Sequence, residues 1–286
     1  MSDNEASDSL PENERLLTYR AASVMGGMDM FQDAFEAVCN AAKGKADFLK
    51  KNPLGYFVSA MIAGLFIAFG SFVSNAVAAP FFEAGDPMQK FMSAATFSVA
   101  LSLVVMAGAE LFTGNNFVLG AVGFAKKLSW GTIVKVWVIC YIGNWVGSLI
   151  AAFLFQASGA ASGTVGELFA SASATKMGMA PLNLVLRGIF CNTLVCLAVW
   201  CGTKLKSESG KLIMVFLCII TFMLCGFEHS VANMTTLAVG LMNAGDAAVS
   251  LGGYFYNLLF VTIGNLIGGV IVVALPYYLI AKKTDK

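Results

Sequence analysis

Six long apolar stretches run through this chain, and they limit its possible folds more than any other feature. They occupy residues 54–80, 92–124, 129–157, 181–203, 211–243 and 254–281. Each is near or above the roughly 20 residues that a helix needs to cross the hydrocarbon core of a bilayer. With 58% hydrophobic and only 12% charged residues, the sequence predicts an all-α polytopic membrane protein with six transmembrane helices.

The sequence predicts four parts along the chain. We expect a disordered cytoplasmic N-terminus at residues 1–27, because this segment is polar and its start is acidic. Residues 28–51 carry apolar side chains at roughly helical spacing with charges between them, which predicts an amphipathic cytoplasmic helix. The six-helix transmembrane domain then occupies residues 52–282, and residues 283–286 form a cytoplasmic tail.

Lysine and arginine residues gather in the segments that six crossings would place on one side of the membrane. These segments lie before the first stretch, between the second and third, between the fourth and fifth, and after the sixth. Because cytoplasmic loops carry an excess of positive charge, both termini are predicted to be cytoplasmic, in a multi-pass protein of the inner cell membrane. A net charge of +1, without a basic stripe or patch, gives no case for nucleic acid as a partner.

The second and fifth stretches are longer than a single crossing requires, and small and polar residues interrupt each of them. The interruptions read GAELFTGNN at 108–116 and CGFEHSVANM at 225–234. Lipid does not tolerate unsatisfied backbone groups, so an interrupted helix has to be buried in protein or line a cavity. We therefore expect broken second and fifth helices.

Landmarks of the first half of the chain return in the second half in the same order. NPLGYF at 52–57 returns as APLNLV at 180–185, and IGNWVGSLI at 142–150 returns as IGNLIGGVI at 263–271. One interruption lies between the two landmarks of each half. Because each half would contain three crossings, the second copy has to be inverted, so the sequence predicts a 3+3 inverted repeat.

The two breaks predict a polar centre inside the protein. A half-helix that starts at a break turns its free N–H groups and positive dipole end toward that centre, which favours a small anion. Thr113 is the polar side chain expected at the first break, and His229 at the second. A hydroxyl and an imidazole can hydrogen-bond an anion or pass it a proton. The alternative is a structural histidine bonded to a backbone carbonyl.

Further polar residues at the breaks and in the IGN motifs are expected to support the two loops. The glutamates precede the expected helix starts, so we predict that they cap backbone amides rather than carry protons. The asparagines of the IGN motifs fit hydrogen bonding between helices. The loop-supporting residues of this prediction are Glu110, Glu228, Asn115, Asn233, Asn144 and Asn265.

At these residues the chain resembles the formate/nitrite transporter family. Hallmarks of that family are an AELFTGN-type loop, here at 109–115, and an FEHSxANM-type segment, here at 227–234. The resemblance covers roughly residues 28–282 and includes NPLG at 52–55 and NTLVCLAVW at 192–200. It implies an aquaporin-like fold in the lipid bilayer, assembled as a homopentamer with one substrate path through each protomer.

The resemblance also implies roles for single residues. Thr113 would belong to a mobile loop, His229 would be a central histidine, and Asn192 would lie nearby. Lys176 would be the vestibule lysine that draws anions inward. The outer constriction would be formed by Phe97 and Phe222, and the inner one by Leu101, Leu111, Phe112 and Val195. From the residues alone, the aromatic and leucine positions fit an ordinary core equally well.

Members of the family move small monovalent anions of weak acids. The resemblance therefore implies passive or proton-coupled transport of formate or nitrite, with hydrosulfide, lactate and acetate as alternatives. In one mechanism the anion takes a proton from His229 or from vestibule water; in the other it passes as an anion while the histidine gates the flow. We favour the first, because desolvating a charge in a narrow apolar tube costs far more than moving a neutral acid.

An intramembrane enzyme is the alternative from a different class. It would need a metal or acid–base site built from Glu110, Glu228 and His229, which is a poor ligand set because one histidine and two carboxylates sit on separate segments. No activated nucleophile is evident. We therefore predict no enzyme, no catalytic residue, no cofactor and no metal. The sequence leaves open which anion is transported, in which direction, and whether the N-terminal helix gates the path with pH.

Overall fold

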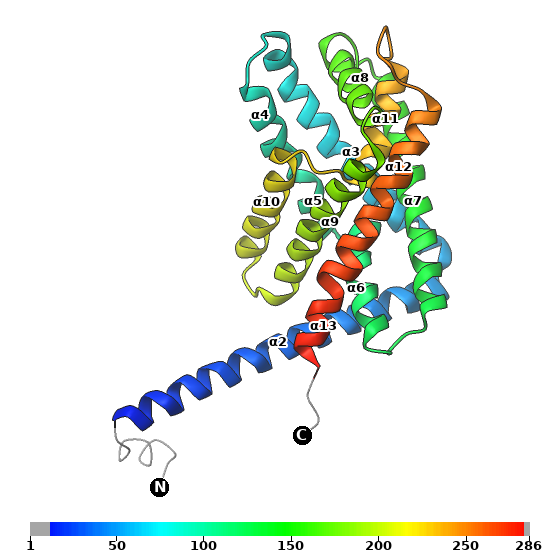
Figure 1. Cartoon of the computed structure of the whole chain (residues 1–286). Coiled ribbons are helices and arrows are strands. Elements are labelled where there is room, and N and C mark those ends of the chain that lie inside the picture. Colours follow the sequence, from blue (N-terminus) through cyan, green and yellow to red (C-terminus); the bar gives the residue numbers. More distant parts are fainter. Residues whose placement is uncertain (1–11, 283–286) are drawn as a thin grey trace.

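The computed structural model describes the backbone of residues 12–282 and the side-chain surroundings of residues 30–282. All regular elements in this range are helices, as Figure 1 shows. Five of them are long and apolar enough to cross a membrane by length and composition: Pro53–Glu83, Met88–Gly108, Trp130–Ala157, Pro181–Lys204 and Leu251–Ala281.

The elements follow one another in a simple order along the chain. They are α2 (Glu12–Lys51), α3 (Pro53–Glu83), α4 (Met88–Phe97), α5 (Val99–Leu103), the π-helix η1 (Val104–Gly108), α6 (Phe112–Phe124), α7 (Trp130–Ala157), α8 (Thr164–Met177), α9 (Pro181–Lys204), α10 (Glu208–Leu224), α11 (Ser230–Met242), α12 (Leu251–Leu266), the π-helix η2 (Ile267–Ala274) and α13 (Leu275–Ala281).

Three of these helices, α8, α10 and α11, do not correspond one to one with the apolar stretches read in the sequence. The fifth stretch, 211–243, is divided between α10 and α11, and neither helix alone reaches the length of a membrane crossing. The helix α8 lies in a segment for which the sequence predicted no element, and it packs against α11. Its short, mixed sequence gives no long apolar run, which is why a search for crossings misses it.

Side-chain caps explain why several helices begin where they do. At the start of α3, the Asn52 side chain accepts from the amide of Gly55, and Pro53 follows at the first helical position. Ser129, Ser207 and Ser250 cap α7, α10 and α12 in the same way, each accepting from the amide three residues on. A polar cap satisfies one of the backbone donors that a helix start leaves free, and proline fits the first turn.

Glycines bring two helix pairs into close contact. A Cβ atom added at Gly147 of α7 would overlap the carbonyl of Met61 in α3, and one at Gly264 of α12 would overlap the carbonyl of Val185 in α9. Small residues at such crossings let helix backbones approach each other closely. The same two crossings bury Asn144 and Asn265 completely, so both asparagines point into the protein.

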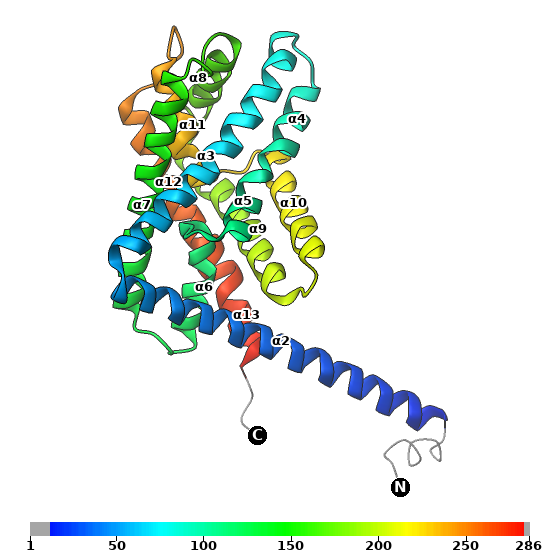
Figure 2. The same cartoon turned by 180° about the vertical axis from the view of Figure 1, so that it is seen from behind.

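The helix α2 crosses beneath one end of the bundle, where α13 also ends (Figures 1 and 2). It begins at Glu12, so residues 12–27, which the sequence predicted to be disordered, lie in a helix. No proline interrupts the chain between Pro11 and Pro53, and the segment is rich in glutamate, leucine, arginine and alanine, which favour helices. The rest of the predicted N-terminus, residues 1–11, and the predicted tail, 283–286, lie outside the described residues.

The C-terminal half of α2 is fixed to the bundle by aromatic contacts and an ion pair. The ring of Phe31 lies 4.8 Å from that of Trp200 in α9 and 5.5 Å from that of Tyr277 in α13, measured between centroids. Glu36 forms an ion pair with Lys127, just beyond α6. These contacts hold α2 against α9, α13 and the turn after α6, so it lies across one end of the bundle.

Candidate functional site

Two short non-helical segments lie at the positions of the interruptions. Residues 109–111 join η1 to α6, and residues 225–229 join α10 to α11. Positive φ angles of 79° at Gly108 and 68° at Gly226 let the chain turn sharply, because glycine adopts this conformation without strain. The helices α6 and α11 therefore both start inside the protein, with their first residues buried.

Asparagine Asn144 of α7 caps the start of α6. Its Oδ1 accepts from the amide of Phe112 at 2.9 Å, and its Nδ2 donates to the carbonyls of Ala60 and Glu110, each at 2.8 Å. These bonds use one backbone donor and two backbone acceptors that a turn inside an apolar protein would otherwise leave unsatisfied.

Asparagine Asn265 of α12 makes the corresponding contacts at the start of α11. Its Oδ1 accepts from the amide of Ser230, and its Nδ2 donates to the carbonyls of Gly188 and Glu228, each at 2.9 Å. The two asparagines, which come from the two IGN motifs, therefore hold the two loops in the same way.

The carboxylates at the two loops bind side chains. Glu110 accepts from Lys45 at 2.8 Å, from the Tyr56 hydroxyl at 3.1 Å and from Asn115 Nδ2 at 2.9 Å. All of these donors come from neighbouring polar side chains, and Lys45 belongs to α2. The end of the bundle beside α2 therefore contains a paired charge rather than a lone carboxylate.

Glu228 has a similar environment toward the other end of the bundle. It accepts from Lys176 at 2.8 Å and from Asn233 Nδ2 at 2.6 Å. The prediction that the glutamates cap backbone amides differs from these contacts, since Asn144 and Asn265 provide the caps. The physical reason is charge, because a buried carboxylate needs a cation or several donors and finds both in side chains.

Thr113 and His229 meet at the centre, between the starts of α6 and α11. The distance from Thr113 Oγ1 to His229 Nε2 is 2.9 Å, and both side chains are buried. His229 Nδ1 accepts from the amide of Ala232 at 3.0 Å and so caps α11. In the neutral ring Nε2 therefore carries the hydrogen and donates to Thr113. A charged ring would have a hydrogen on Nδ1 and would lose the cap.

A cavity of about 170 Å³ reaches His229 from the side of α8. Its wall includes Lys176, Phe97 and Phe222, and the residues that line it include no aspartate or glutamate. The rings of Phe97 and Phe222 lie 6.0 Å apart between centroids, and Phe222 lies nearly parallel to the His229 ring at 6.1 Å. Of the two aromatic residues predicted as an outer constriction, Phe222 therefore lies beside the histidine, and Phe97 packs against Phe222.

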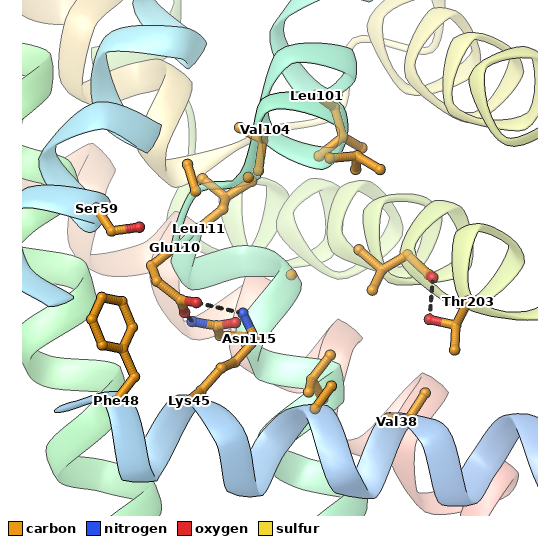
Figure 3. A pocket seen from close by; sticks show the side chains of 17 residues that line it. Val38, Lys45, Phe48, Ser59, Leu101, Val104, Glu110, Leu111, Asn115 and Thr203 are labelled. Atoms are coloured by element: carbon orange, nitrogen blue, oxygen red, sulfur yellow. Dashed lines mark hydrogen bonds and ion pairs between the residues drawn. The ribbon is translucent and has the colours of Figure 1, made fainter. Parts of the chain in front are cut away.

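A larger cavity of about 460 Å³ lies on the side of α2, and Figure 3 shows its lining. Lys45 of α2 and Glu110 both face it, together with Leu101 and Leu111, two of the residues predicted for an inner constriction. The residues that line this cavity include neither Thr113 nor His229. The two cavities therefore approach the centre from opposite ends, and only the one beside α8 reaches the histidine.

Four predicted pathway residues line neither cavity: Thr113, which meets His229 at the centre, and Phe112, Val195 and Asn192. Phe112 packs against Tyr141 with ring centroids 4.9 Å apart, and Val195 is buried in the core. Asn192 donates to the carbonyl of Asn265 at 2.7 Å and to Asn116 Oδ1 at 3.0 Å. Asn192 therefore binds the helix that carries Asn265 and is not part of either cavity wall.

Sequence reasoning missed two residues of the site, Lys45 and Tyr56. The sequence places Lys45 only among the predicted cytoplasmic charges, and it assigns no role to Tyr56. A usable signal existed, since Glu110 lies inside an apolar stretch and a carboxylate there needs a cationic or hydroxyl partner from another segment. Within the described part of the chain, no group of three or more histidine, cysteine, aspartate or glutamate residues is arranged to hold a metal ion.

The fold and site define a helical membrane protein whose polar centre is held between two helix starts. A family model described as "Formate/nitrite transporter" matches residues 32–279. The chain therefore belongs to the formate/nitrite transporter family.

Related proteins of known name and structure support this assignment. The nitrite transporter NirC of Salmonella typhimurium is 33% identical over 262 residues, which cover 90% of this chain and 94% of that protein. A solved structure of an FNT family ion channel aligns with a TM-score of 0.81 at 32% identity, covering 86% of this chain and 98% of that chain. A pentameric formate channel with formate bound aligns with a TM-score of 0.72 at 28% identity, covering 81% and 98%.

Proposed function

We propose that this protein transports formate, nitrite or both across the cytoplasmic membrane, through a path inside each protomer. The observation that carries the proposal is the contact between Thr113 and His229, because a cavity lined by Lys176 and several other polar side chains reaches the histidine. Such a wall offers hydrogen-bond donors to a small anion. Similarity to a nitrite transporter and to a channel with bound formate supports these two substrates.

The proposed architecture is a 3+3 inverted repeat of six crossings. In it, α4 to α6 form a broken second crossing and α10 to α11 a broken fifth. The matching contacts of Asn144 and Asn265 support the repeat, since each caps one helix start and binds two carbonyls. Similarity to a pentameric channel supports a homopentamer in the bilayer. We place both termini, and α2, on the cytoplasmic side, because the charge distribution of the loops favours it.

The proposed mechanism is movement of the substrate past the centre as a neutral acid. Lys176 attracts the anion into the cavity beside α8, and the anion leaves water next to Phe97 and Phe222. Passage of a charge between Leu101 and Leu111 would cost far more than passage of the neutral acid. The proton comes from vestibule water or from His229. To act as the donor, the neutral His229 ring first takes up a second proton on Nδ1, which releases the Ala232 amide, and then gives the Nε2 proton to the anion and returns to its neutral form. In this mechanism the substrate only gains and loses a proton, and none of its other covalent bonds changes. The proposed activity is therefore transport and not enzymatic catalysis.

Uptake into proteoliposomes tests this function. Formate, nitrite, hydrosulfide and lactate are compared at fixed total concentration across a pH series. We expect formate or nitrite to enter much faster than it enters protein-free vesicles, and uptake to increase as the external pH falls, because more of the anion can be protonated. Uptake at the protein-free rate for all four substrates would contradict the proposal.

A further inference from the structure

The cavity that reaches His229 has a hydroxyl-bearing wall opposite α8 and α11. Ser74 of α3 and Ser93 of α4 both line it, and their Oγ atoms lie 2.6 Å apart. Ser74 is almost completely buried, with 1% of its surface exposed, and Ser93 is half-buried. The pair therefore joins two helices at the edge of the cavity.

The Ser74–Ser93 pair has one hydroxyl hydrogen that the bond between the two oxygens does not use. Two hydroxyl groups carry two hydrogens, and the bond between the oxygens uses one. Serine and threonine in a helix often donate to the carbonyl four residues earlier, as Thr96 does to Met92 at 2.8 Å. Within residues 30–282, neither Ser74 nor Ser93 makes such a bond or any second one. One hydroxyl hydrogen is thus left for a partner in the cavity.

The rest of the wall also offers donors. Lys176 has three N–H hydrogens, and its bond to Glu228 uses one of them. The amide side chains of Asn75 and Gln89 line the same space, and its lining includes no carboxylate. The cavity on the α2 side differs, because Glu110 is part of its wall. Glu228 balances the charge of Lys176, so the wall complements an anion through its hydrogen donors.

We infer that the Ser74–Ser93 pair forms a binding site for a small monovalent oxyanion in this cavity. The anion accepts the spare hydroxyl hydrogen in the cavity that Lys176 also lines, before it reaches His229. The inference rests on the proposed function and deepens it, because it assigns the first point of contact on the α8 side. A volume of about 170 Å³ restricts the site to small anions.

The double variant Ser74→Ala/Ser93→Ala tests the site. Half-saturating concentrations of formate and nitrite are measured separately from the α8 side and the α2 side, in vesicles of known orientation. Loss of one hydrogen bond is expected to raise the value on the α8 side about two- to tenfold and to leave the value on the α2 side unchanged. Ser93→Thr keeps the hydroxyl and is expected to retain the wild-type value.

Ser102→Ala provides a matched control, because Ser102 only donates to the carbonyl of Ser98 in its own helix turn and lines neither cavity. Melting temperature and elution volume establish that the variants fold. Should the double variant not fold, Ser93→Ala alone is expected to give a smaller rise in the same direction. A folded variant with the wild-type value on the α8 side, or an equal rise on both sides, would overturn the inference alone. Absence of uptake by the wild-type protein would overturn it together with the proposed function.

Discussion

Replacement of His229 by asparagine is expected to reduce proton movement that accompanies anion uptake, while uptake itself continues. Asparagine is a good N-cap, so its Oδ1 can accept from the Ala232 amide as His229 Nδ1 does at 3.0 Å. The start of α11 is therefore kept, and only the group that can exchange a proton is lost. The measurement is current and proton flux recorded together in the same proteoliposomes, with formate or nitrite as the anion.

Replacement of His229 by phenylalanine is the matched variant. It removes the cap on Ala232 and the contact with Thr113 together, so we expect slower uptake and a lower melting temperature than for the asparagine variant. Equal coupled proton movement in the wild-type protein and in His229→Asn would remove histidine as the required donor. Vestibule water would then be the only proton source left in the mechanism.

Replacement of Asn265 by leucine is expected to prevent folding or lower the melting temperature sharply. The substitution leaves the Ser230 amide and the carbonyls of Gly188 and Glu228 without their partner. An unsatisfied buried group costs about 1–3 kcal/mol, so three such groups together approach the whole stability of a typical domain, about 5–15 kcal/mol. Heating of the detergent-solubilised protein, followed by size-exclusion chromatography, measures the effect.

Asn75→Leu is the control for this prediction. Asn75 makes one side-chain bond among the described residues, to the carbonyl of Ser71 in its own helix, so we expect a much smaller change in melting temperature. An Asn265→Leu protein that has the wild-type melting temperature and the wild-type uptake rate would show that the asparagine does not hold the loop.

Much of the fold could be predicted because membrane crossings leave long apolar runs in a sequence. The residues at the breaks were also predictable, since Glu110, His229 and the IGN asparagines are polar groups at positions where lipid would exclude them. That Thr113 and His229 lie within hydrogen-bond distance was not predictable from spacing alone, because 116 positions separate them and only packing brings them together.

Other features depend on tertiary contacts that a single sequence does not encode locally. The two glutamates could bind either amides or side chains, and the choice depends on where α2 and α8 place Lys45 and Lys176. The helical start of α2 at Glu12 was missed because a polar, acidic composition is shared by disordered segments and by solvated helices. Asn192 was assigned by resemblance, while its observed bonds lead to Asn265 and Asn116.

The central claim is that the anion moves through the protomer by way of the cavity beside α8. Ala172 of α8 lines that cavity, so Ala172→Trp places an indole in a space of about 170 Å³. Ser171→Trp adds the same ring at the exposed neighbouring position, which does not line the cavity. The decisive measurement is the initial rate of formate and nitrite uptake by the two folded variants. We expect Ala172→Trp to take up anion no faster than vesicles without protein, and Ser171→Trp to take it up at nearly the wild-type rate. Undiminished uptake by Ala172→Trp would contradict the path.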